Sequence, residues 1–155
     1  MHLVVPMIGS NLIGAGCALA LAVAVGLVAH ELAHATILRL AGVDYSISYL
    51  PGRSNGIVAL VTTHPWAVVS PRPTGHEPVW ILRLAALAPA ALAVPVFGLG
   101  LAGYVTANTP IAAAVAIGWL ACALPSPQDF SVAFHANRLL ERSRKPNTAA
   151  PSRAD

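Results

Sequence analysis

The stretch LIGAGCALALAVAVGLVAHELAH, residues 12–34, decides how this chain folds. Residues 12–29 carry no charge, which is enough apolar sequence for a helix that crosses a bilayer. Helical composition continues to Leu40, and Gly42 is expected to end the helix. Because such a helix, at about 1.5 Å per residue, exceeds the thickness of the hydrocarbon, its last turns should reach the membrane face that Arg39 marks.

His30-Glu31-Leu32-Ala33-His34 is an H-E-x-x-H motif at the end of this stretch. Histidines at this spacing lie on the same face of a helix, so both imidazoles can bind one metal ion. Glu31 can then serve as general base for an attacking water. The alternative is a helix whose histidines and carboxylate pair with neighbouring residues. Ionisable groups in hydrocarbon cost roughly 2.5–3.5 kcal/mol each, so the cluster favours a compensating ion.

The composition is that of a membrane protein. Of 155 residues, 56% are hydrophobic and 10% are charged, whereas soluble domains carry about 25% charged residues. The net charge of +3 comes from scattered basic residues, with no basic stripe interleaved with aromatic side chains. We therefore expect the lipid bilayer as a partner and exclude nucleic acid.

A β-hairpin is expected after the first span. Residues 43–49 alternate apolar and polar side chains, residues 51–56 have turn chemistry, and residues 57–63 would be the returning strand. Loop residues would then lead through residue 78 to the next span. The hairpin edge, including residues 56–61, could hold an extended substrate as an added strand.

Two further spans follow. Residues 84–105 are uncharged and include Pro89 and Pro95, which should bend the helix by removing backbone donors. A short connection at residues 106–110 leads into a third apolar run, residues 111–124.

An amphipathic helix is expected to open at Ser126-Pro127-Gln128-Asp129. The predicted fold class is therefore all-α membrane protein, with three transmembrane helices, a β-hairpin between the first two and a C-terminal amphipathic helix. Residues 1–143 would form one integral membrane metalloprotease-like domain, and residues 144–155 a disordered tail.

The positions of the basic residues predict the orientation. With three spans, the N-terminus and residues 106–110 share one side and contain no Lys or Arg, whereas all 9 basic residues lie on or next to the other side. The positive-inside rule makes that other side cytoplasmic. We expect a multi-pass protein of the cell membrane whose motif meets residues 126–129 at the cytoplasmic face.

A catalytic zinc site normally has three protein ligands, so two histidines require another donor. We favour Asp129 because it lies at the end of a span on the correct face. Its alternative role is local, since Ser126 and Asp129 form an S-x-x-D capping arrangement. Competing donors are His64, His76, Glu77 and His135, while Asp44 and Glu141 look like solvated residues.

The layout from residue 11 to residue 143 resembles the site-2 protease family of intramembrane zinc metalloproteases. The specific match is H-E-L-A-H at residues 30–34. The resemblance implies that His30, His34 and the aspartate of a later L-D-G motif hold zinc, and that the substrate is a transmembrane protein. Here that later motif reads Gln128-Asp129-Phe130, without the flanking Leu and Gly, so the chain looks like a minimal or divergent member.

We therefore expect an intramembrane zinc endopeptidase in which Glu31 is catalytic and His30, His34 and Asp129 bind Zn²⁺. Its substrates would be membrane-associated peptide segments cleaved within or near the bilayer. The alternative is a non-catalytic membrane module that binds zinc or a partner. A further alternative is a metalloenzyme of the prenyl-protein peptidase type, whose third ligand would have to be Glu77 or Glu141.

Overall fold

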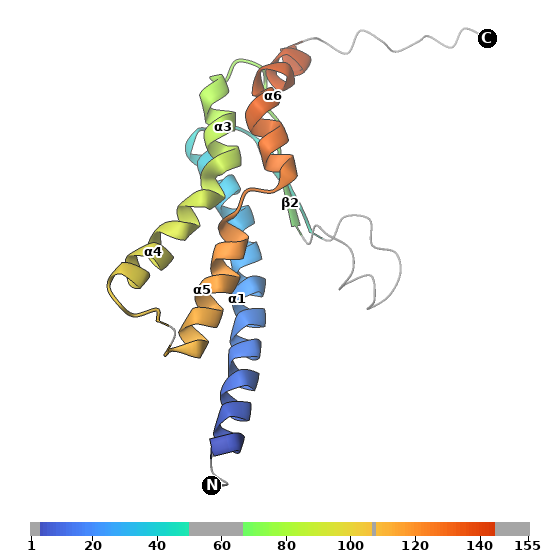
Figure 1. Ribbon diagram of the computed structural model, residues 1–155. Coiled ribbons are helices and arrows are strands. Elements are labelled where there is room, and N and C mark those ends of the chain that lie inside the picture. Colours follow the sequence, from blue (N-terminus) through green and yellow to red (C-terminus); the bar gives the residue numbers. More distant parts are fainter. Residues whose placement is uncertain (1–3, 50–66, 107, 145–155) are drawn as a thin grey trace, which may run out of the picture.

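The computed structural model describes residues 4–49, 67–106 and 108–144. Its first element is the long helix α1 (Val4–Leu40), which rises from the N-terminal end of the molecule to the lower parts of α3 (Val79–Leu87) and α6 (Pro127–Arg144) (Figure 1). Gly42, with φ of 68°, ends it, and the Val43 N–H donates to the Leu38 carbonyl oxygen at 2.9 Å. The first span and its end at Gly42 are as predicted.

The hairpin has a different second strand from the one predicted. The strand β1 (Tyr45–Tyr49) pairs with the antiparallel strand β2 (Ala67–Pro71), with Ile47 opposite Val69. Sequence analysis assigned residues 67–71 to a loop, which is wrong, while its returning strand and turn at residues 51–63 lie outside the described residues. Local β-propensity alone does not determine which segment pairs with β1. The position of β2 also depends on its contacts with α1.

The second span is broken where proline was expected to bend it. It consists of α3 (Val79–Leu87), the 3-10 helix η1 (Ala88–Leu92) and α4 (Ala93–Leu101), and it begins earlier than predicted. Pro89 lies in the first turn of η1, where its missing N–H prevents a regular α-helical bond. In Figure 1, α4 diverges from α5 beyond this break.

The third span and the final helix are joined by a short extended segment. The helix α5 (Pro110–Ala123) packs along α1, and α6 (Pro127–Arg144) packs beside α3 (Figure 1). The amphipathic helix is therefore confirmed as α6, and it includes Arg144, which was expected in the tail. Residues 145–155 of the predicted tail lie outside the described part of the chain.

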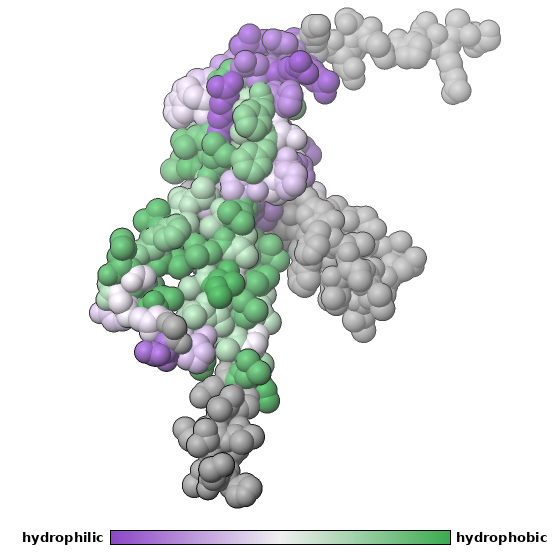
Figure 2. All heavy atoms as spheres, viewed as in Figure 1, coloured by the Kyte–Doolittle hydropathy of each residue, from purple (hydrophilic) through white to green (hydrophobic). Residues whose placement is uncertain are grey.

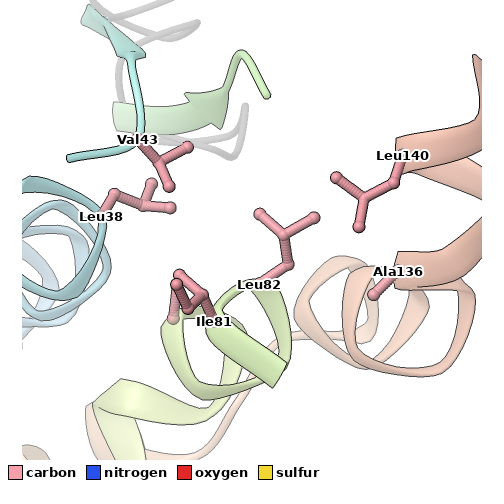
Figure 3. Close-up of a cluster of buried hydrophobic side chains, with 7 residues drawn as sticks. Leu38, Val43, Ile81, Leu82, Ala136 and Leu140 are labelled. Carbon is pink, nitrogen blue, oxygen red and sulfur yellow. The ribbon is translucent and has the colours of Figure 1, made fainter. Parts of the chain in front are cut away.

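A small apolar core joins α1, α3, α6 and the segment before β1. Figure 3 shows its side chains converging from these elements. The cluster comprises Leu38, Val43, Ile81, Leu82, Ala85, Ala136 and Leu140. This core fixes α6 and α3 against the end of α1 that carries the H-E-x-x-H motif.

Three segments, Leu12–Leu40, Val79–Leu101 and Pro110–Arg144, are long and apolar enough to span a membrane. Their outward side chains include large exposed hydrophobic residues, with Leu12, Leu21 and Ile117 at 74%, 67% and 63% exposure. In Figure 2, hydrophobic residues cover α4 and α5, and hydrophilic residues gather over the far end of α6. A multi-pass membrane protein accounts for this surface, because apolar patches of this extent are rare on soluble monomers.

Candidate metal centre

His30 and His34 face one another on α1. Their Nε2 atoms are 3.2 Å apart, their ring centroids are 4.9 Å apart, and the residues are only 8% and 7% exposed. One turn of helix separates them, as the motif predicted. Both imidazoles therefore present the same nitrogen to a common point in the protein interior.

The other nitrogen of each ring is held by a different span. His30 Nδ1 donates to the Cys122 carbonyl oxygen on α5, and His34 Nδ1 donates to the Ala85 carbonyl oxygen on α3, both at 2.7 Å. A carbonyl can only accept, so these partners assign a proton to each Nδ1, and in the neutral imidazole Nε2 then carries a lone pair. All three spans thus orient the imidazoles.

Pro89 explains why the Ala85 carbonyl is available. In a regular helix this oxygen would accept from the N–H four residues later, but that residue is Pro89, which has none. The Ala85 oxygen accepts instead from the Ala88 N–H and from His34. Cys122 lies in the last turn of α5, where carbonyls also lack partners within the helix.

Asp129 is both a helix cap and a neighbour of the histidines. Its Oδ2 is 3.3 Å from His30 Nε2, and its Oδ1 is 3.2 Å from His34 Nε2. Its Oδ2 also accepts from the Ser126 N–H at 2.6 Å, and its own N–H donates to the Ser126 hydroxyl at 3.2 Å. The capping role considered from sequence is therefore present, and the same cap aims the carboxylate at the histidine pair.

His30, His34 and Asp129 form a group that could hold a metal ion. One ligand atom from each residue lies within 4.8 Å of the other two. The two Nε2 atoms are 3.2 Å apart, close to the roughly 3.3 Å between ligand atoms of a tetrahedral ion with bonds of about 2.0–2.1 Å, and each Nε2 lies beside a different Asp129 oxygen. Two imidazole lone pairs and a carboxylate repel one another unless a cation or shared protons lie between them. The donor set and its spacing thus suit a divalent cation.

Glu31 lies beside this group but is held by a different element, the strand β2. The Val69 N–H of β2 donates to Glu31 Oε2 at 3.1 Å, and Glu31 is half-buried. This contact also explains the position of β2, which sequence analysis missed. Glu31 is therefore anchored close to the candidate ligands without belonging to the group that could bind the ion.

The group opens into a cleft of about 910 Å³ with mainly apolar walls. α1, α3, β2 and the start of α6 all contribute to it, and its lining includes Val28, Leu82, Ser70, Gln128 and Val132. A volume of this size accommodates a small ligand or a short peptide segment. Within the described part of the chain, the candidate metal site therefore lies on an open cleft.

The competing donors lie away from the site wherever they are described. His135 and His76 are exposed, and His64 lies outside the described residues. Asp44 and Glu141 are exposed, as expected. The prenyl-protein peptidase alternative loses support because neither of the glutamates it needs belongs to the group that could hold a metal ion.

Glu77, one of those glutamates, serves the loop before α3. Its carboxylate accepts from the N–H and hydroxyl of Thr74, both at 2.8 Å, and from the Gly75 N–H at 2.9 Å. Desolvation raises the pKa of Glu77, but these hydrogen bonds outweigh it and lower the pKa from 4.5 to about 2. The Arg144 guanidinium donates to the Gly75 carbonyl and ties this loop to the end of α6.

Comparisons with known proteins add no family assignment. Neither a protein-family model, a curated protein nor a solved structure matches this chain. The resemblance to the site-2 protease family therefore rests on the motif and the layout of the spans.

Proposed function

We propose that this protein is a multi-pass membrane zinc endopeptidase of the site-2 protease type. One observation carries the proposal: Glu31 lies beside three convergent donors, His30, His34 and Asp129, and all four line an apolar cleft. A site that only stored zinc would need neither an additional carboxylate beside the ligands nor an opening of this size. Nitrogen and oxygen donors in this motif favour zinc over other divalent ions.

Each of these residues has a separate role in the proposed reaction. His30, His34 and Asp129 would hold Zn²⁺, which when bound lowers the pKa of water and polarises a peptide carbonyl. Glu31 accepts the proton of the attacking water and returns it to the leaving amine. The carbonyls that accept from the histidine Nδ1 atoms keep each Nε2 directed at the ion throughout.

The substrate would be a membrane-associated peptide segment in extended form. A helical segment hides its carbonyls in its own hydrogen bonds, so it must unwind before hydrolysis. The edge of β2 lies at the cleft and can receive an unwound segment as an added strand. In this proposal strand addition occurs at residues 67–71; residues 56–61, which the sequence analysis considered for this role, lie outside the described residues.

The site would face the cytoplasm. Arg39, Arg72, Arg138 and Arg142 lie near the end of the molecule where the motif and α6 meet, and the positive-inside rule assigns that end to the cytoplasm. The partners are then the bilayer and a membrane-inserted substrate.

Replacing the proposed base tests the function. Purified protein in lipid nanodiscs is loaded with zinc and given a fluorogenic single-span peptide, with Glu31→Gln as the test variant and the exposed Glu141→Gln as its control. A peptidase loses at least about 100-fold in turnover with Glu31→Gln while still binding zinc, and Glu141→Gln keeps its activity. A non-catalytic zinc module would cleave nothing in any variant yet bind zinc in all three.

A further inference from the structure

The hydrogen-bonding direction along β2 shows which of its amides face the cleft. Ile47 opposes Val69, and the Arg72 N–H donates to the Asp44 carbonyl at 2.7 Å, so the N–H groups of even-numbered residues point to β1. Because successive N–H groups alternate, those of Ala67 and Val69 point to the free edge. The bond from Val69 to Glu31 agrees with this direction.

The edge of β2 that faces away from β1, which is unpaired among the described residues, therefore has few donors. Position 71 is a proline and has no N–H, which leaves the amides of Ala67 and Val69 for any strand that pairs there. The Val69 amide is already used by the Glu31 carboxylate. A peptide carbonyl that pairs with β2 at this point must take the donor from Glu31.

We propose that the Val69 amide is exchanged between the general base and the substrate. In the resting site this amide holds Glu31 against β2; when an extended peptide pairs with β2, its carbonyl accepts the same N–H and Glu31 is released toward the attacking water. Productive positioning of the base is thereby coupled to strand pairing. The inference rests on the proposed function for the role of Glu31, but the exchange itself is a binding event.

A double-mutant cycle measured by binding tests the exchange. The probe is a dansylated valine-alanine hexapeptide whose central amide is replaced by a ketomethylene, which zinc-loaded protein cannot hydrolyse. If Glu31 competes for one hydrogen bond, Glu31→Ala should bind the probe roughly threefold to tenfold more tightly than wild type. Val69→Pro removes the amide at a position where an edge strand tolerates proline, so in that background Glu31→Ala should change affinity by less than about twofold.

Ala67→Pro is the matched control. It removes the other outward amide of β2 and should weaken binding, but the tightening caused by Glu31→Ala should persist in its background. The proposal is overturned if Glu31→Ala does not tighten binding of the probe, or if it tightens binding by the same factor in the wild-type and Val69→Pro backgrounds. It is also overturned if no variant binds the probe. Hydrolysis of the fluorogenic peptide without this coupling would overturn the exchange alone, and coupling without hydrolysis would overturn only the peptidase.

Amide exchange provides a second measurement if Val69→Pro does not fold. In ¹⁵N-labelled full-length protein, the Val69 amide should be protected from deuterium in wild type, exposed in Glu31→Ala, and protected again when the probe is added. The Val68 amide, which faces β1, should stay protected in all three states. A Val69 amide that the probe leaves unprotected would contradict the exchange.

Discussion

Gly26→Ala tests how closely the packing of α1 on α5 controls the candidate metal centre. Gly26 lies one turn before His30, and a Cβ built there would be 2.9 Å from both Cβ and Sγ of Cys122. Carbon atoms in contact are normally about 3.5–4.0 Å apart. The two helices must therefore separate locally by roughly 0.6–1.1 Å.

This separation would break the hydrogen bond that orients His30. The distance from His30 Nδ1 to the Cys122 carbonyl oxygen would grow from 2.7 Å to about 3.3 Å or more, beyond the normal range. Loss of such a partner lowers metal affinity by roughly 10- to 100-fold. That corresponds to about 1.4–2.8 kcal/mol of binding free energy.

The assay is zinc titration of the full chain in lipid nanodiscs, in competition with a chromophoric chelator. Gly16→Ala is the control on the same helix, because a Cβ there meets nothing within 4 Å, and its zinc Kd should stay unchanged. Adding Cys122→Gly to Gly26→Ala should restore affinity, since the clash is removed and the carbonyl remains. Wild-type affinity in Gly26→Ala, or an equal loss in Gly16→Ala, would refute this reasoning.

Three further changes test other parts of the fold. Ser126→Ala removes the hydroxyl that accepts from the Asp129 N–H, and should lower the free energy of unfolding by about 1 kcal/mol and weaken zinc binding. Chemical denaturation measures the first effect and zinc titration the second. Unchanged values would show that the cap is dispensable. Gly75→Ala forces an alanine to adopt φ of 93° with its Cβ 2.5 Å from Arg144 Cγ, and should cost roughly 1–3 kcal/mol in the same unfolding assay, whereas wild-type stability would mean that the loop can move away. Because the pKa of Glu77 falls from 4.5 to about 2 on folding, its ionised form stabilises the protein above pH 4.5 and this contribution is lost as the pH drops toward 2. The stability advantage of wild type over Glu77→Gln should shrink across that window in thermal unfolding, and a difference independent of pH would argue against the hydrogen bonds to Glu77.

Local sequence patterns were sufficient to predict most of the helices and the group that could hold a metal ion. Long uncharged runs predict the spans because hydrocarbon tolerates little else, and Gly42 ends α1 as glycine commonly ends helices. The H-E-x-x-H spacing predicts the histidine pair from helix geometry alone. Asp129 could also be predicted, because the alternating direction of the three spans brings the end of α5 to the same membrane face as the motif.

The missed features depend on contacts between distant segments. β2 was taken for a loop because five residues carry too little periodicity, and its position depends on β1 and on Glu31. The carbonyl partners of the histidines were also missed. One signal was present: Pro89 lies four residues after Ala85, and a proline inside a span leaves the carbonyl four residues earlier in need of a donor.

The central claim is that one ion lies between His30, His34 and Asp129. Anomalous diffraction at the zinc edge, from crystals of the full chain grown with zinc, tests it directly. The account predicts one strong peak within about 2.0–2.2 Å of both Nε2 atoms and of one Asp129 carboxylate oxygen. A peak too far from Asp129 for a bond to its carboxylate, a zinc ion bound to Cys122, or no peak between the histidines would contradict it.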